Sequence, residues 1–87
     1  TAKSAVREEQ GSMIIAVNKE GEVWIENNKI ELNAVRSHVE RAHAQNPEGT
    51  IIILADQNSR TGITVEVLDQ VRLAGVTNVS IAASNEE

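Results

Sequence analysis

The sequence has no cysteine, a single proline and a single aromatic residue, Trp24. Without cysteine it can form neither disulfides nor thiolate zinc sites. Without phenylalanine or tyrosine it lacks the stacking platforms on which proteins hold single-stranded nucleic acid. Positive charge is also scarce: eight basic residues against thirteen acidic ones give a net charge of −5. Such a chain repels a phosphate backbone, so no nucleic acid is expected among its partners.

Long hydrophobic runs are absent as well. No apolar stretch approaches the roughly 20 residues that cross a bilayer, and the polar first residues do not resemble a signal peptide. The 87 residues, of which 40% are hydrophobic and 24% charged, provide for one small core. We expect a flexible tail or linker at residues 1–11, a folded domain at residues 12–84 and a polar tail at residues 85–87.

Short apolar segments separated by turn residues predict the element order β-β-(β)-α-β-α-β. Gly21 supplies a turn residue that takes positive φ at no steric cost. Pro47 ends the first helix, and Gly75 stands where a left-handed cap is expected after the second. The expected strands are residues 13–17, 22–26, 50–55 and 77–83, with a minimal strand at 29–30, and the expected helices are residues 32–45 and 61–74.

The expected core lies between the helices and the sheet. In the second helix the apolar residues, among them Val67 and Val71, fall within one arc of about 140°. The strand at residues 50–55 shows no alternation, so both of its faces are expected to be buried, and Ile52 and Leu54 are assigned to the core. The predicted fold class is α+β, with two helices packed on one face of a small mixed β-sheet.

The sheet face opposite the helices is expected to carry apolar side chains without a helix over them, because right-handed crossovers place both helices on one side. Burying a few hundred Å² of such surface is worth several kcal/mol at about 25 cal/mol per Å², and surfaces of this kind usually belong to an interface. An interface on this face or on a sheet edge is therefore expected. Two local explanations stay open, namely that the tail folds back over this face or that the strands are shorter.

A search for catalytic or metal-binding chemistry finds no site. His38 and His43 are five residues apart on one expected helix and point about 140° apart, so they cannot share an ion as an i,i+4 pair can. His43 is expected to be partly buried and His38 to be solvated. No catalytic residue, metal ligand or cofactor is assigned, and the pattern favours a binding or coupling module over an enzyme.

Asp56 is the most suggestive polar residue. It follows an apolar strand at the carboxyl end, where open α/β sheets often place sites. Arg60 and Thr61 stand beside the next helix start, whose free N–H groups can hold an anion. The other interpretation is that Asp56 accepts hydrogen bonds from backbone amides of its own turn.

Two segments carry a family resemblance: Leu54-Ala-Asp56, and the stretch from Val67 to Val76 that reads VLDQVRLAGV. With a hairpin at residues 17–21 and a first helix at 32–39, the chain resembles the ExbD/TolR family of biopolymer-transport proteins over residues 13–83. It differs from the common family pattern at Gln57, where lysine is frequent, and at Thr61, where an aromatic residue is frequent.

The resemblance implies a single-pass inner-membrane protein whose periplasmic part is this domain. Its transmembrane helix, which lies outside this chain, would pair with an ExbB-like channel subunit, and the complex would use the proton gradient to energise TonB or TolA. On this basis the domain is expected to dimerise and to engage a TonB-like or TolA-like partner. A partner segment adding as a strand to a sheet edge would meet Val79 and Ile81; the alternative is that these two residues simply pack beneath the helices.

Three functional hypotheses follow. The first is the periplasmic domain of an ExbD-like energy-coupling subunit that engages TonB. The second is a TolR-like subunit of the Tol cell-envelope system, contacting TolA or peptidoglycan. The third, from another class, is a small anion-binding domain that uses Asp56 and Arg60 at the start of the second helix.

Overall fold

A computed structural model describes residues 12–59 and 61–84. The tails expected at residues 1–11 and 85–87 lie outside this range. The described elements, in order, are β1 (Met13–Val17), β2 (Val23–Ile25), β3 (Asn28–Ile30), the 3₁₀ helix η2 (Leu32–Ala34), α1 (Val35–Gln45), β4 (Ile51–Asp56), α2 (Thr61–Leu73) and β5 (Val79–Ser84).

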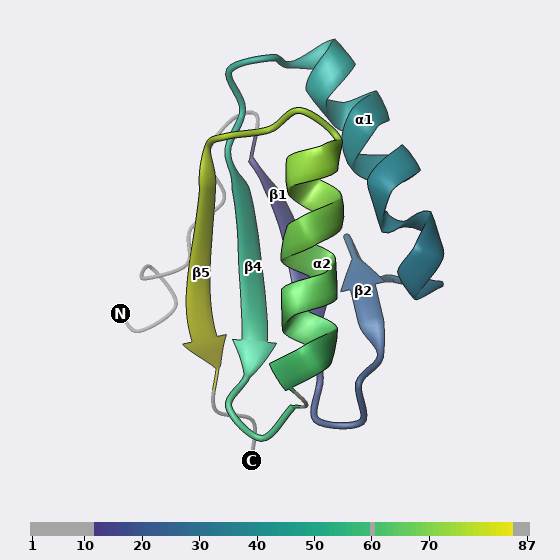
Figure 1. The fold of residues 1–87 in the computed structure, drawn as a ribbon, viewed down its shortest axis with the longest axis vertical. Coiled ribbons are helices and arrows are strands. Elements are labelled where there is room, and N and C mark those ends of the chain that lie inside the picture. The colour runs from purple at the N-terminus through teal and green to yellow at the C-terminus, as the bar shows by residue number, and fades with distance from the viewer. Residues whose placement is uncertain (1–11, 60, 85–87) are drawn as a thin grey trace.

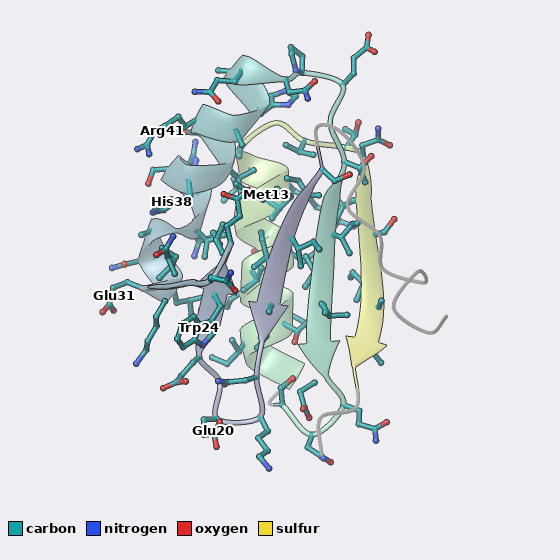
Figure 2. The ribbon with its side chains drawn as sticks, turned by 180° about the vertical axis from the view of Figure 1, so that it is seen from behind. Met13, Glu20, Trp24, Glu31, His38 and Arg41 are labelled. Carbon is teal, nitrogen blue, oxygen red and sulfur yellow. The ribbon has the colours of Figure 1, made fainter. Side chains whose placement is uncertain are left out.

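The described strands form one mixed sheet in the order β3-β2-β1-β4-β5. The β1–β2 and β2–β3 pairs are antiparallel, and the β1–β4 and β4–β5 pairs are parallel. Both helices cover the same face of this sheet, and the view from behind shows the strands in front of them (Figures 1 and 2). The predicted α+β class with two helices on one face of a mixed sheet is confirmed.

Alternation along β1, β2 and the first four residues of β4 decides which of their residues enter the core. Side chains of a strand point alternately to opposite faces, and in β4 it is Ile51 and Ile53 that are buried. Our assignment of Ile52 and Leu54 to the core is wrong: both have intermediate exposure on the other face. Because residues 51–54 are all apolar, the sequence does not show which of them face the helices.

The helices contribute the other half of the core, where Val67 and Val71 are fully buried as predicted. The apolar stripes of both helices therefore meet the alternate strand residues in one cluster. Its members are Met13, Ile15, Val17, Val23, Ile25, Val35, Val39, Ile51, Ile53, Val67, Val71 and Val76.

The opposite sheet face carries half-buried apolar side chains in register. Ile14 of β1 pairs with Ile52 of β4, and Ala16 lies between Trp24 and Leu54. All five have intermediate exposure, so this face is less open to solvent than the sequence predicts.

Gln70 joins the two helices. Its side-chain Nε2 donates to the carbonyl of Leu32 at 2.6 Å, and its Oε1 accepts the backbone N–H of Arg36 at 2.8 Å. The N–H of Arg36 lies in the first turn of α1, where N–H groups lack intrahelical partners, whereas the Leu32 carbonyl also accepts the N–H of Val35. One side chain of α2 therefore completes the start of the neighbouring helix.

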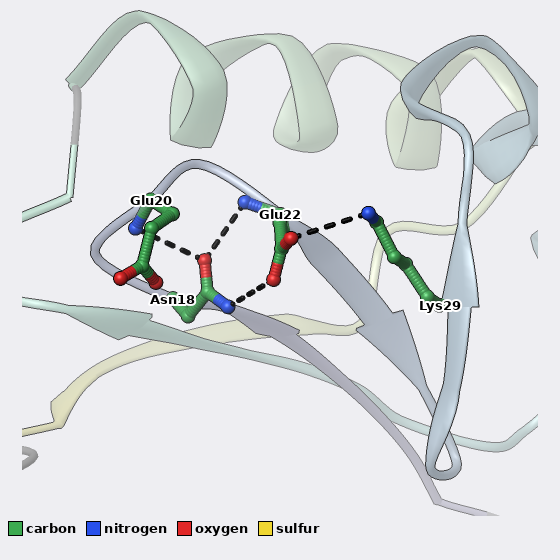
Figure 3. A network of polar contacts seen from close by, with 4 residues as sticks. All are labelled: Asn18, Glu20, Glu22 and Lys29. Carbon is green, nitrogen blue, oxygen red and sulfur yellow. Dashed lines mark hydrogen bonds and ion pairs between the residues drawn. The ribbon is translucent and has the colours of Figure 1, made fainter.

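A polar network closes the first hairpin (Figure 3). The Asn18 Oδ1 accepts the backbone N–H groups of Glu20 at 3.1 Å and Glu22 at 2.8 Å, and its Nδ2 donates to the Glu22 carboxylate at 2.8 Å. Lys29 lies 3.2 Å from the other Glu22 oxygen. The hydrogen bond from Asn18, with the help of Lys29, lowers the pKa of Glu22 below its usual value.

The second hairpin turns one residue earlier than expected. The loop is Glu26–Asn27, between the paired residues Ile25 and Asn28, and both loop residues have positive φ, 51° and 71°. This is the geometry of the type I′ turn, which matches the twist of the flanking strands. Gly21 and Gly75 also have positive φ, 85° and 97°, as their expected turn and cap positions require.

Candidate partner interface

The strand β5 is an edge of the sheet, as predicted for the segment through Val79 and Ile81. It is six residues long, and its sequence, VSIAAS, contains no charge. An edge strand presents unpaired backbone groups that another chain can pair with. The opposite edge, β3, is only three residues long and carries Lys29, so it has two of the features that protect an edge from pairing.

Ile81 is the exposed apolar residue of this edge. It pairs in register with the buried Ile53 and so points to the helix-covered side of the sheet, yet 53% of its surface is exposed. Val79, on the same side, is half-buried. The helices thus shield the inner strands and leave the edge strand partly uncovered.

A groove of about 460 Å³ runs between α2 and the first part of β5. Its apolar lining comes from both elements, and Arg72 borders it with an exposed side chain. The lining residues are Leu68, Arg72, Val76, Thr77, Val79 and Ile81. At about 100° per residue, the exposed Val65 lies within about 60° of Leu68 on the same side of α2.

A second hollow, of about 210 Å³, continues from Ile81 to the carboxyl ends of β4 and β5. Its floor and walls include Ala82 and Ala83 of β5 and Thr64 of α2, and Asp56 lies among the lining residues. Because Ile81 borders both hollows, the two lie next to each other along the edge strand.

Asp56 is 3% exposed and belongs to β4, although we expected it in the following loop. Its Oδ1 accepts the backbone N–H of Asn58 at 2.8 Å, and its backbone carbonyl accepts the N–H of Ser59 at 2.8 Å. The expected turn-stabilising role of Asp56 is confirmed by these bonds. The other carboxylate oxygen, Oδ2, is buried and has no hydrogen-bond partner among the described residues.

The remaining expected interface residues are only partly described. Thr61 begins α2, but its side chain lies outside the described part, as does the whole of Arg60. The sequence did not point to Thr64, Arg72 or Ala83 as neighbours of the edge. The available signal was that Val65 and Leu73 lie off the apolar arc of the helix, and both are exposed.

The histidines lie elsewhere. His43 is partly buried, as expected, and His38, which we expected to be solvated, also has intermediate exposure. His38 lines a hollow between α1 and the β2–β3 hairpin together with Glu26 and Arg41, and Figure 2 shows His38 and Arg41 along α1. In the described ranges no group of three or more histidine, aspartate or glutamate side chains is placed to hold a metal ion.

The fold and this edge define a small α+β module with the features of a binding domain: an uncharged sheet edge beside an apolar groove. A family model described as biopolymer transport protein ExbD/TolR matches residues 1–86. The chain therefore belongs to the ExbD/TolR family.

A curated relative is biopolymer transport protein exbD2 of Vibrio cholerae serotype O1 (strain ATCC 39315 / El Tor Inaba N16961), which is 26% identical over 83 residues. The match covers 95% of this chain but 62% of that protein. None of the helices within residues 12–59 and 61–84 has the length and hydrophobicity needed to cross a membrane.

Proposed function

We propose that this chain is the periplasmic domain of an ExbD-like subunit that couples the proton gradient across the inner membrane to transport. In this proposal a membrane-spanning part of the same protein pairs with an ExbB-like channel subunit, and the domain dimerises and engages a TonB-like protein. Membership of the biopolymer-transport family and the similarity to an ExbD2 protein support this assignment.

The observation that carries the proposed mode of engagement is the β5 edge. An extended partner segment adds to β5 as a sixth strand, its backbone hydrogen bonds provide affinity, and its alternate side chains enter the groove beside α2. The exposed Ile81 and the absence of charge in β5 favour this edge over the short, lysine-bearing β3.

An NMR titration tests this mode of binding. The isotope-labelled chain is mixed with overlapping peptides from the periplasmic region of the TonB and TolA proteins of the same organism. We expect shifts of the backbone amides along β5 and of groove residues such as Leu68. Shifts confined to residues 1–11, or to the β3 side of the sheet, would contradict strand addition at β5.

Two lysine substitutions on the same strand provide a matched pair. Ile81→Lys places a charge at the groove, whereas Ser80→Lys places it on the opposite sheet face, since alternate residues of a strand point to opposite sides. Both positions are exposed, so both variants should fold. We expect I81K to weaken peptide binding at least tenfold and S80K to change it much less.

The choice between the ExbD-like and TolR-like roles depends on the partner. Preference for a TonB peptide supports the first role, and preference for a TolA peptide or co-sedimentation with peptidoglycan supports the second. The proposed homodimer, with the half-buried face around Ile52 and Leu54 or a sheet edge as its contact, is tested separately by sedimentation at increasing protein concentration.

The anion-binding alternative is disfavoured by the geometry of Asp56. A buried carboxylate oxygen that already lacks a donor repels an anion beside it. Titration with phosphate is the test, and saturable binding near the start of α2 would revive this alternative.

A further inference from the structure

We infer that Asp56 is the specificity residue of the β5 edge and that it receives a cationic side chain, lysine or arginine, from the docked partner segment. This inference rests on the proposed function for the presence of a partner strand. It adds the chemical identity of one partner residue and the place where that residue binds.

Only one of the two carboxylate oxygens of Asp56 has a hydrogen-bond partner among the described residues. Oδ1 has the Asn58 amide at 2.8 Å, whereas Oδ2 is buried without a partner among the described residues. A buried acceptor without a donor is costly, and more so when it is charged. Buried polar groups in native proteins nearly always have partners, so a carboxylate left in this state points to a donor other than the described residues.

The hollow beside Asp56 is the place from which that donor can come. It is about 210 Å³ in volume, which accommodates the end of a long side chain. Its described lining includes neutral polar groups, from Ser59, Gln57 and Thr64, and small apolar residues of β5, but no positive charge.

The hollow also lies directly on the path of a docked strand, because Ile81, Ala82 and Ala83 of β5 line it. A residue of the partner that pairs with the end of β5 therefore lies next to the hollow that Asp56 lines. The apolar walls accept the methylene stem of lysine or arginine while the charged end reaches the carboxylate.

A cationic donor fits better than a neutral one. Hydrogen bonds between ionised groups are roughly twice as strong as neutral ones, and the chain as a whole has a net charge of −5. Charge complementarity at one end of the groove also fixes the register of an otherwise repetitive backbone pairing, which is how charged groups contribute specificity at interfaces.

The test uses two capped peptides of alternating valine and threonine that differ at one terminal residue, either lysine or its uncharged analogue norleucine. The variable residue is placed at each end in turn, so that no strand direction is assumed. Binding to the 87-residue chain is followed by the amide shifts of β5. We expect the lysine peptide, in one of the two placements, to bind at least tenfold more tightly than the norleucine peptide, since hydrogen bonds to charged groups are worth that much.

Asp56→Asn is the key variant. It keeps the size of the side chain and an acceptor for Asn58, but it cannot offer a second carboxylate oxygen to a cation. The preference for lysine should vanish in D56N while the norleucine peptide binds as before, and a thermal melt verifies that the variant is folded. Arg60→Gln tests whether the basic residue four positions after Asp56 supplies the donor instead, and the preference should persist in it. If the preference appears only in R60Q, the natural partner of Asp56 is within the chain and the inference is wrong.

A third measurement separates this inference from the proposed strand docking. Butylammonium and the neutral butanol are titrated against the chain while the side-chain carboxyl carbon of Asp56 is observed. A saturable shift with butylammonium alone supports a cation site even if no peptide docks, and the corresponding amide carbon of D56N should not shift. Equal binding of both peptides with β5 shifts would leave strand docking intact and overturn the cation site. Absence of any Asp56 response to butylammonium and to the lysine peptide would overturn it as well.

Discussion

The bridge made by Gln70 provides a quantitative test of the fold, through the substitutions Gln70→Ala and Gln70→Met. Both remove the hydrogen bonds to Leu32 and Arg36, at 2.6 and 2.8 Å. A typical hydrogen bond contributes about 0.5–1.5 kcal/mol net. The one to Leu32 is partly buried and the one to Arg36 is exposed, so the lower half of the combined range, about 1–2 kcal/mol, is expected.

The two substitutions separate hydrogen bonding from packing. Methionine keeps the length of glutamine and has a similar helix propensity, and alanine slightly favours the helix. If hydrogen bonds are the cause, both variants lose similar stability, and the midpoint of thermal unfolding falls by about 4–16 °C, given 4–8 °C per kcal/mol in domains of this size. Urea unfolding measured by circular dichroism gives the free energies directly.

The control is Glu66→Ala, at an exposed position of the same helix. Its effect should lie within about 0.5 kcal/mol of zero, as for surface substitutions in general. If Q70A and Q70M are no less stable than E66A, the two contacts contribute nothing and the helix pair is held by its apolar faces alone.

Three further predictions concern the turns and the core. Glu26→Asn should raise the free energy of unfolding by roughly 0.5–1 kcal/mol. An ordinary L-residue at φ 51° costs about 1–2 kcal/mol, whereas asparagine tolerates the type I′ turn. An unchanged urea midpoint would contradict this. By carbon NMR, Glu22 should titrate below its usual pKa and return towards it in Asn18→Ala, since the Asn18 amide is the main cause of the lowering. Because that pKa is lowered on folding, the stabilisation is complete above the unfolded-state pKa, near 4.5, and is lost as the pH falls through the folded-state value. Val71→Asp should abolish cooperative unfolding, since an unpaired buried charge costs roughly 4 kcal/mol or more, whereas Val65→Asp, at a position 54% exposed, should leave the melt nearly unchanged.

The order of elements could be predicted from the sequence because each element carries its own local signal. Gly21, Pro47 and Gly75 mark turns and ends through backbone restrictions that do not depend on the rest of the chain. The stripe containing Val67 and Val71 is likewise a property of one helix.

Features that depend on the alternation of side chains along a strand, or on how strands pair, were predicted less well. Ile52 and Ile53 are chemically equivalent in the sequence, and only the pairing of β4 with β1 decides which of them faces the helices. The type I′ turn at Glu26 was missed for a similar reason, because glutamate is not a residue that favours positive φ, and strand twist overrides its local preference.

The candidate site was predictable only in part. The edge position of β5 followed from its place at the end of the chain and its lack of charge. Asp56 was found because it ends an apolar strand. Its unpartnered oxygen could not be found from the sequence, since that depends on which amides of the turn come within reach of which carboxylate oxygen.

The helix α2 explains why the fold and the interface are separable. At about 100° per residue, Val67 and Val71 point into the core, Gln70 lies on the side next to α1, and Leu68 lies on the side next to β5. Changes at Val67 or Val71 should unfold the domain, and changes at Gln70 should weaken the contact between the two helices. Changes at Leu68, or at Ile81 across the groove, should alter binding alone, because these two side chains already contact water in the folded chain.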